Sequence, residues 1–517
     1  MFRRRRLVSL VSVCSLATAL IGLAQDPQSQ FKLTADQTAA IDSVSAESLR
    51  GHLSFIASDL LEGRETPSRG LDLAAEYIAA QFRRAGIEAA GDDGYFQTAN
   101  WLVTDRDLSG FVLRMSSSGQ TVNVSNDQIG LPYPDGADLS GAPVFKLSSA
   151  DSSTLNELKP EQITGRIVLV AARPQEPGRR GEAVEGQSDI ASRMKALKAA
   201  AVIAITTGPA AGAAPRRLID PENRPAISQP AAGPFVVVND SKFAALFETL
   251  KPGASPATID LKVPALEERP VKLHNVVGVL QGSDSVLRDT FVLVTAHYDH
   301  LGVRGTGEGD HIFNGANDDG SGTASVIELA SALSRLKPPP KRSIVFMTFF
   351  GEERGLLGSR FYGRHPVFPI NKTVADINLE QVGRTDSTEG PQIGTASLTG
   401  YDYSEVGTIL TAAGHITGIK VYKHERNSDA YFNRSDNQAL ATLGVAAHTL
   451  CVAYDYPDYH KASDHWDKID YANMAKVVKM VAVGILMIAE RTAEPTWNES
   501  NPKAQRYAEA WKARRSS

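Results

Sequence analysis

The stretch Thr-Phe-Val-Leu-Val-Thr-Ala-His-Tyr-Asp, residues 290–299, decides the fold. Its first seven residues form an apolar run with several β-branched side chains, which predicts a buried strand. The run ends in His297, Tyr298 and Asp299, whose side chains can bind metals or carry protons. Continuous apolar strands are typical of mainly parallel sheets that helices cover on both faces. The stretch therefore predicts an α/β fold with reactive side chains at a strand end.

Apolar strands and helices alternate around this run. We expect further strands at residues 276–280, 343–350, 374–379 and 444–453, and helices at residues 70–85, 323–336 and 474–490. This alternation predicts a mainly parallel, mixed sheet flanked by helices. The last helix contains Lys476 and Lys479, so we expect it to pack in the core rather than to span a membrane.

The chain is long enough for more than one domain, with 517 residues. Residues 126–265 are rich in Ala, Pro and Gly, contain no histidine, and carry three short apolar runs. We expect them to form an inserted β-rich domain without catalytic groups. The expected parts are a signal peptide at 1–24, the first part of the main domain at 25–125, the insert at 126–265, the main domain at 266–495 and a polar C-terminal tail at 496–517.

The N-terminus has the pattern of an export signal. Four arginines at 3–6 precede an apolar stretch at 7–23, which ends in Gly22-Leu23-Ala24. A cleaved signal peptide fits better than an uncleaved anchor because the stretch is short for a membrane span. We therefore expect a periplasmic or extracellular protein with no stable membrane anchor after cleavage. Cleavage removes Cys14 and leaves Cys451 alone, so no internal disulfide can form.

The overall charge excludes one class of partner. The formal net charge is −5 and the sequence pI is about 6.2, so no large basic surface is implied. Nucleic-acid-binding domains carry such a surface. We therefore expect no nucleic-acid partner.

The expected strand ends bring together side chains that can bind metal ions. Ligands of open α/β sheets bind beyond the carboxyl ends of the strands. Four strands and one helix start offer a candidate ligand there: His297, Asp318, Glu353, Glu380 and His460. Taken singly, each has an ordinary explanation, such as a helix cap for Asp318 or a solvated surface for Glu353. Taken together, the five favour a site for two metal ions.

The residue types suit zinc. Zinc accepts imidazole nitrogen and carboxylate oxygen at roughly 2.0–2.2 Å. Two ions roughly 3.5–4 Å apart repel each other, so a bridging carboxylate is favoured, and one histidine and one further carboxylate can then serve each ion. Glu352, a free carboxylate beside Glu353, is the expected general base toward water. Asp299, two residues past His297, is expected to hold that imidazole, and Asp464 to do the same for His460.

These ordered motifs resemble the co-catalytic zinc aminopeptidases, a family that includes secreted bacterial leucyl-type aminopeptidases and glutamate carboxypeptidases. The likeness rests on residues 297–299, 315–322 and 350–359, and on Tyr459-His460 with Asp464. It covers almost the whole mature chain and implies a zinc-exopeptidase-like fold, two zinc ions per chain and a peptide substrate. The insert resembles a protease-associated domain through residues 164–170 and 195–202, which are mostly small and apolar.

The resemblance also implies a role for each matched residue. His297 and Glu380 would be the terminal ligands of one zinc ion, Glu353 and His460 those of the other, and Asp318 would bridge both. Glu352 would be the general base, and Tyr459 would donate a hydrogen bond to the oxyanion of the tetrahedral intermediate. The Asp318–Asp319 peptide would be cis.

Two positions depart from the family pattern. Glu380 stands where aminopeptidases of the family most often have Asp, at a position that also helps to receive the free amine of the substrate. Asn437 stands where a His is common, and the sequence offers no physical account of that change. The expected activity is that of an aminopeptidase. A carboxypeptidase or dipeptidase, a glutaminyl cyclase and a non-catalytic peptide-binding protein are the alternatives.

Overall fold

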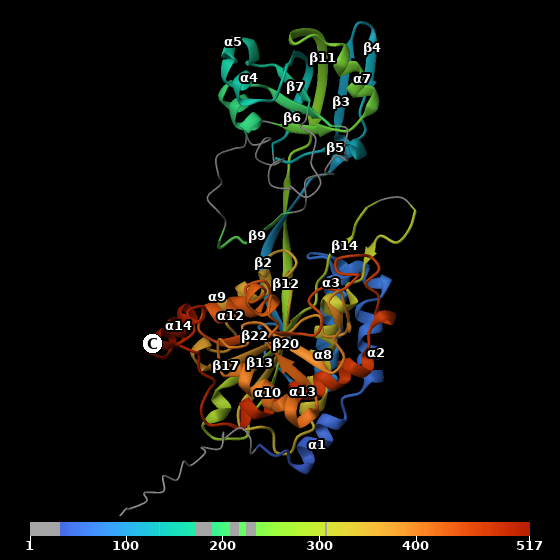
Figure 1. Cartoon of the computed structure of the whole chain (residues 1–517). Coiled ribbons are helices and arrows are strands. Elements are labelled where there is room, and N and C mark those ends of the chain that lie inside the picture. The colour runs from blue at the N-terminus through green and yellow to red at the C-terminus, as the bar shows by residue number, and fades with distance from the viewer. Residues whose placement is uncertain are drawn as a thin grey trace, which may run out of the picture. The chain divides into compact units, whose positions relative to one another are not determined.

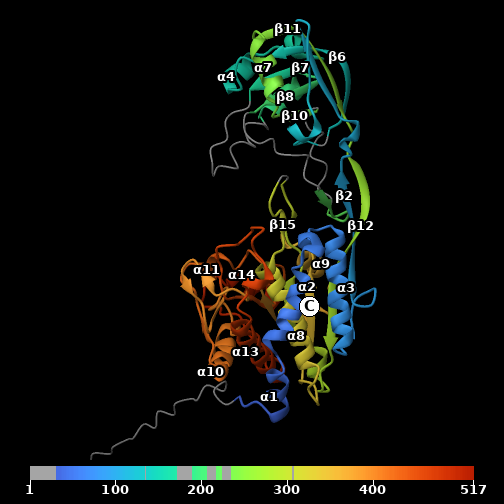
Figure 2. The same cartoon turned by 90° about the vertical axis from the view of Figure 1, so that its right-hand side faces the viewer.

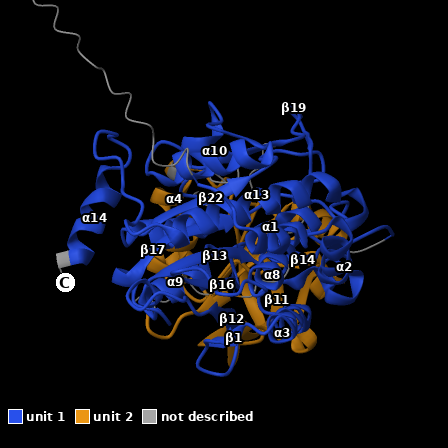
Figure 3. Cartoon of the chain, turned by 90° about the horizontal axis from the view of Figure 1, so that it is seen from below, with its two compact units in different colours: residues 1–97, 274–517 blue, residues 98–273 orange. Residues whose placement is uncertain are grey.

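The computed structural model describes residues 31–133, 135–171, 189–206, 217–223, 234–305 and 308–516. The expected signal peptide at 1–24 lies outside these residues. The chain divides into two compact units, one of residues 1–97 and 274–517 and the other of residues 98–273 (Figures 1 and 3). Strands β2 (Phe96–Asp105) and β12 (Glu267–Leu280) contain the two points where the chain passes from one unit to the other.

The first unit is built on a mixed sheet with a parallel centre. Its strands follow the order β21-β20-β22-β17-β13-β16-β12. Their bounds are β13 (Phe291–His297), β16 (Ser343–Phe349), β17 (Thr373–Leu379), β20 (Thr395–Leu398), β21 (Lys420–Tyr422) and β22 (Ala446–Cys451). The strands β16, β13, β17 and β22 are mutually parallel, with Leu293 opposite both Val345 and Asp376. The expected α/β fold with a mixed, mainly parallel sheet is confirmed.

Helices cover this sheet (Figures 1 and 2). They are α1 (Ala35–Asp42), α2 (Ala46–Ile56), α3 (Arg69–Arg84), α8 (Ser321–Leu333), α9 (Leu357–Arg364), α10 (Val406–Thr417), α12 (Asn437–Thr442), α13 (Tyr471–Glu490) and α14 (Gln505–Ser516). Helix α8 packs on β13, β16 and β17, and α13 packs against α10 and α2. By length and composition α13 could cross a membrane, but 83% of its apolar window is buried, as in a core helix.

Local sequence signals explain helix α3. The Ser68 side chain accepts the N–H of Leu71 and caps the first turn. The buried side chains recur at helical spacing: Leu71, Ala74, Ala75, Ile78 and Phe82. Gly86 follows the helix at a φ of +73°, a conformation that glycine adopts without steric cost. This buried face fixes α3 against the sheet.

The C-terminus differs from the expected polar tail. Residues 505–516 form α14, and Tyr507 and Ala508 are buried in the same core cluster as Trp497 and Phe432. The Nη1 group of Arg514 donates to the carbonyls of Ile370 and Thr373, both at 2.6 Å. The segment is polar overall, but its few apolar side chains lie on one helix face and dock on the first unit.

The second unit has its own sheet and two cores. The strand order is β4-β3-β11-β6-β7-β8-β10-β5. The bounds are β3 (Val112–Ser117), β4 (Gln120–Asn123), β5 (Ile129–Gly130), β6 (Ala137–Lys146), β7 (Ile167–Ala171), β8 (Ala201–Ile205), β10 (Phe235–Val238) and β11 (Gly253–Val263). Helix α7 (Ser241–Thr249) contributes Phe243, Leu246 and Phe247 to one core cluster. The short helices α4 (Ser152–Glu157) and α5 (Pro160–Ile163) contribute Leu155 and Ile163 to the other.

This unit extends beyond the expected insert at 126–265. Strand β3 pairs with β11, with Met115 opposite Ile259, and β4 pairs with β3. This long-range pairing places residues 112–123 in the second unit. The three apolar runs noted in the sequence form β7, β8 and β10, which are neighbours in parallel.

Candidate metal centre

The candidate site lies where the parallel strands of the first unit end. His297 is the last residue of β13, Glu352 and Glu353 follow β16, and Glu380 follows β17. His460 lies in the loop after β22. Because β16, β13, β17 and β22 are parallel, their carboxyl ends face the same edge of the sheet. The structure thus brings these candidate residues to one edge of the sheet, the edge at which the sequence predicts them.

His297 is buried and held in one orientation. Its Nδ1 lies 3.2 Å from the carbonyl oxygen of Asp299 and 3.5 Å from Oδ1 of the same residue. Both are acceptors, so Nδ1 carries the proton and the lone pair of Nε2 is left for another partner. Nε2 lies 3.3 Å from Oδ1 of Asp318. Burial opposes protonation, yet the carboxylates of Asp299 and Asp318 hold the pKa of His297 well above its usual value.

Asp318 stands between the two histidines. Its Oδ1 faces His297, and its Oδ2 lies 3.0 Å from Nε2 of His460. Burial raises the pKa of its carboxyl, but the adjacent imidazoles of His297 and His460 outweigh burial and hold that pKa below the usual range. The Asp318–Asp319 peptide is cis, as the resemblance implies. One carboxylate therefore contacts both imidazoles through different oxygens.

The main chain around Asp318 is fixed from two sides. Asp464 accepts the N–H groups of Asn317 and Asp318, at 3.0 and 3.3 Å. The expected contact of Asp464 with His460 is therefore replaced by a contact with the bridging segment. Asp319 accepts the N–H of Gly322 at 2.9 Å. A Cβ at Gly322 would lie 2.4 Å from Oδ2 of Asp319, so only glycine allows this close approach.

Glu353 forms the second histidine contact. Its Oε1 lies 3.3 Å from Nε2 of His460 and 2.8 Å from Nδ1 of His300. Burial and the Asp318 charge raise the pKa of Glu353, but the two imidazoles outweigh them and lower it to about 2. Sequence reasoning missed His300. Its position next to Asp299, in the same loop as His297, was the available signal.

Glu380 and Glu352 complete the cluster of acids. Donor atoms of His297, Asp318 and Glu380 all lie within 4.8 Å of one another. Burial raises the pKa of Glu380 to about 7 and that of Glu352 well above its usual value. The main-chain N–H of Glu352 donates to Oδ1 of Asp299 at 3.0 Å. The longer side chain of Glu380 therefore still reaches the cluster.

The donor atoms fit zinc. Two ligand atoms of one tetrahedral zinc ion are about 3.3 Å apart, given bond lengths of about 2.0–2.1 Å. The contacts of His297 and His460 with the carboxylates measure 3.3, 3.0 and 3.3 Å. Nε2 of His297 and Oε1 of Glu353 are buried and have no partner in hydrogen-bond geometry among the described residues. Imidazole and carboxylate atoms at this spacing are what zinc requires.

A cavity of about 480 Å³ opens onto the cluster. Its lining includes Asp318, Glu352, Glu353, Glu380, Tyr431, Tyr454, Tyr459 and His460. Tyr459 stacks on His460, with ring centroids 4.0 Å apart, and its side chain is 40% exposed. Burial and the nearby carboxylates raise the pKa of Tyr459, so its hydroxyl keeps its proton. The hydroxyl is a hydrogen-bond donor in the cavity wall.

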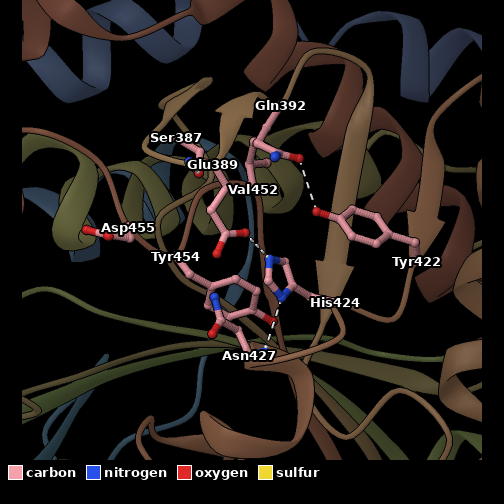
Figure 4. A pocket seen from close by; sticks show the side chains of 9 residues that line it. All are labelled: Ser387, Glu389, Gln392, Tyr422, His424, Asn427, Val452, Tyr454 and Asp455. Carbon is pink, nitrogen blue, oxygen red and sulfur yellow. Dashed lines mark hydrogen bonds and ion pairs between the residues drawn. The ribbon is translucent and has the colours of Figure 1, made fainter.

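Tyr454 also lines a second cavity of about 10 Å³, room for about one water molecule (Figure 4). There His424 contacts Glu389 through Nε2 and accepts the N–H of Asn427 through Nδ1. The Tyr454 ring meets the His424 ring edge-on, with centroids 5.5 Å apart. These polar groups satisfy one another, and Tyr454 belongs to the linings of both cavities.

Two further residues position the site. Arg64 is fully buried and donates to the carbonyls of Tyr298, Ile56, Asn314 and Gly315, which joins the loops that carry His297 and Asp318. Asn437 is also buried. Its Oδ1 accepts from Thr449 at 2.9 Å and its Nδ2 donates to the carbonyl of Phe432 at 3.1 Å. Asn437 thus ties the segment after α11 (Asn427–Ala430) to β22.

Comparisons with known proteins match the part of the chain that contains this site. Residues 275–485 match Peptidase family M28. These residues contain all five candidate ligands, and the resemblance of the chain to the co-catalytic zinc aminopeptidases is confirmed.

Two curated proteins and one solved structure are also similar to this chain. A probable zinc metalloprotease of Pyrenophora teres f. teres (strain 0-1) is 37% identical over 134 residues, 25% of this chain and 28% of that protein. Aminopeptidase YwaD of Bacillus subtilis (strain 168) is 34% identical over 111 residues, 21% of this chain and 22% of that protein. The chain thus matches under a third of the length of each. An aminopeptidase structure from Aneurinibacillus sp. strain AM-1 has the same fold, with a TM-score of 0.53, 20% identity and coverage of 89% of this chain and 97% of that one.

Proposed function

We propose that this protein is an exported two-zinc aminopeptidase. The observation that carries the proposal is the position of Asp318, whose two carboxylate oxygens face His297 and His460 separately. His297 and Glu380 would hold one ion, Glu353 and His460 the other, and Asp318 both. Zinc ions, when bound, supply Lewis acidity that polarises a peptide carbonyl and activates water at neutral pH.

His460 suits a ligand better than His300. His460 lines the cavity and contacts both Asp318 and Glu353. His300 is fully buried and contacts Glu353 at 2.8 Å. We assign His300 to the orientation of the Glu353 carboxylate. Loss of His460 should therefore abolish binding of one zinc ion, whereas loss of His300 should only weaken it.

The protein's own residues would move protons and bind the substrate. Glu352 lines the cavity with a raised pKa, and its main chain is anchored on Asp299. Its carboxylate would take a proton from the attacking water and deliver it to the leaving amine. Tyr459 would donate its hydroxyl hydrogen to the oxyanion. Glu380 would attract the free ammonium group of the substrate.

The insert and the N-terminus complete the proposal. The second unit would act as a protease-associated domain that affects substrate choice or stability more than chemistry. Residues 1–24 would direct export to the periplasm or the medium. Deleting the whole second unit, residues 98–273, should leave the metal ligands in place, since all of them lie in the first unit.

Hydrolysis of amino-acid p-nitroanilides tests the activity. The full chain is assayed on free and N-acetylated forms of the same substrates, with and without a chelator. Cleavage of the free-amine forms alone, lost with chelator and restored by zinc, is the expected result. Cleavage of the acetylated forms would overturn the aminopeptidase assignment. Absence of cleavage would favour carboxypeptidase, dipeptidase or glutaminyl cyclase chemistry, or a binding protein.

A further inference from the structure

Two arginines line the same cavity as the four carboxylates. Arg360 and Arg434 both belong to its lining, and both side chains are exposed. Within the described part of the chain, no carboxylate forms an ion pair with either guanidinium group. Most other arginines near this region are engaged, as Arg354 is with Glu65 and Arg384 with Asp386 and Asp458. The two cavity arginines are therefore available to a ligand.

The fold places these arginines on two segments that are joined by a hydrogen bond. The Arg434 guanidinium lies over the ring of Tyr431, 4.8 Å from its centroid, and Tyr431 also lines the cavity. Arg360 lies on α9, next to Ser359. The Ser359 hydroxyl donates to Oδ1 of Asp436 at 2.5 Å, which joins α9 to the segment that carries Arg434. The two cations thus belong to two linked segments of one wall.

The summed charge of the cavity lining indicates that these arginines would attract an anionic group. The cavity carries four carboxylates, from Asp318, Glu352, Glu353 and Glu380. Two divalent ions would balance those four negative charges, so the two arginines would leave a net charge of about +2. Arginine binds carboxylates through two parallel hydrogen bonds, which gives both affinity and orientation. The volume of about 480 Å³ lies in the range of sites for small ligands, roughly 300–1,000 Å³.

From this placement we propose that Arg360 and Arg434 bind a carboxylate of a short peptide substrate. The inference rests on the proposed peptidase function and deepens it. The carboxylate has two sources, the C-terminus of a di- or tripeptide and the side chain of an acidic residue. If the arginines bind the C-terminal carboxylate, the enzyme prefers short peptides. If they bind a side-chain carboxylate, the enzyme prefers peptides that contain Asp or Glu.

Matched substrates separate the two sources. Leu-Gly is compared with Leu-Gly-amide, which lacks only the terminal carboxylate. Glu-Gly-amide is compared with Gln-Gly-amide, and Leu-Glu-amide with Leu-Gln-amide, which differ only in the side-chain charge. We expect the carboxylate-bearing member of at least one pair to have a kcat/KM about tenfold or more higher, the size typical of a hydrogen bond to a charged group.

Variants test whether the two arginines cause the preference for the carboxylate-bearing substrate. Arg434→Gln and Arg360→Gln should each reduce the preferred pair's kcat/KM ratio by about tenfold, mainly through KM. Arg335→Gln, at an exposed arginine just after α8 and outside the cavity lining, is the matched control and should keep the wild-type ratio. Zinc content and thermal unfolding are measured for each variant to show that it is folded and loaded.

The outcomes are distinct. Wild-type ratios near one for all three pairs, with rapid hydrolysis of all substrates, would overturn the carboxylate site and leave the peptidase assignment intact. Ratios that persist in both arginine variants would also overturn it. Absence of hydrolysis of every substrate by the zinc-loaded wild type would overturn the proposed function and this inference together.

Discussion

Oδ1 of Asp299 accepts the main-chain N–H of Glu352 at 3.0 Å. The same side chain accepts the Thr66 hydroxyl at 3.1 Å through Oδ2 and lies beside Nδ1 of His297. Asp299 therefore links the proposed general base to a proposed zinc ligand. This one carboxylate therefore fixes the main chain that follows β16 and the orientation of the His297 ring at the end of β13.

Replacing Asp299 tests this link. Asp299→Asn removes the charge that supports the His297 ring, and zinc affinity should fall about 10–100-fold. Competition with a chromogenic chelator measures that affinity. Asp310→Asn, at an exposed aspartate, is the control and should not change it. Unchanged zinc affinity in Asp299→Asn would contradict the role of Asp299.

Replacing Glu352 separates catalysis from metal binding. Glu352→Gln should keep both zinc ions and lose activity by at least about 100-fold, because general-base catalysis is worth about 10²–10⁴. Glu353→Gln, at the neighbouring position, should lose zinc instead. Metal analysis and steady-state kinetics on both variants give the comparison. Loss of zinc from Glu352→Gln would show that Glu352 is itself a ligand.

Replacing Arg64 should lower the free energy of unfolding strongly. Arg64→Met would leave four carbonyl groups without their donor, each at a cost of roughly 1–3 kcal/mol when it stays buried. We expect the free energy of unfolding to fall by at least about 3 kcal/mol. Urea denaturation measures the change. Arg50→Met, at an exposed position of α2, is the control, and a comparable loss in both variants would contradict the role of Arg64.

A buried carboxyl predicts a pH dependence of stability. Asp376 lies within β17 and is fully buried, which raises its pKa to about 8, although Thr295 donates a hydrogen bond to it. Because the folded pKa lies above the unfolded value, the stabilising contribution is complete below about pH 4 and is lost as the pH rises toward 8. Asp376→Asn stays neutral at every pH.

The variant should therefore lose less stability between pH 5 and 8 than the wild type does. The difference can reach roughly 1.4 kcal/mol per pH unit within that window. Urea denaturation at pH 5, 6.5 and 8 measures the free energy of unfolding of both proteins. Equal pH slopes would show that Asp376 is ionised throughout.

The strands and the candidate ligands could be predicted from the sequence because each strand of the parallel centre is a continuous apolar run. His297, Glu353 and Glu380 follow those runs directly, so their convergence follows from parallel pairing alone. The loop containing His460 was harder to place. It depends on Arg384, which donates to Asp458 at 2.9 Å, a contact between residues far apart in sequence.

Other features depend on contacts that no local pattern encodes. His300 was missed because its ring faces Glu353 across the site, and sequence spacing says nothing of that direction. Helix α14 was missed because Tyr507 and Ala508 gain their burial from the core around Phe432. The extent of the second unit depends on the pairing of β3 with β11. Each is a tertiary contact between distant segments.

An anomalous-diffraction map of zinc-loaded crystals at the zinc absorption edge tests directly whether two zinc ions bind at Asp318. We expect two peaks roughly 3.5–4 Å apart. One should lie beside His297 and Glu380, the other beside Glu353 and His460, with Asp318 between them. A single peak, or a peak held by His300 in place of His460, would contradict the proposed two-zinc site.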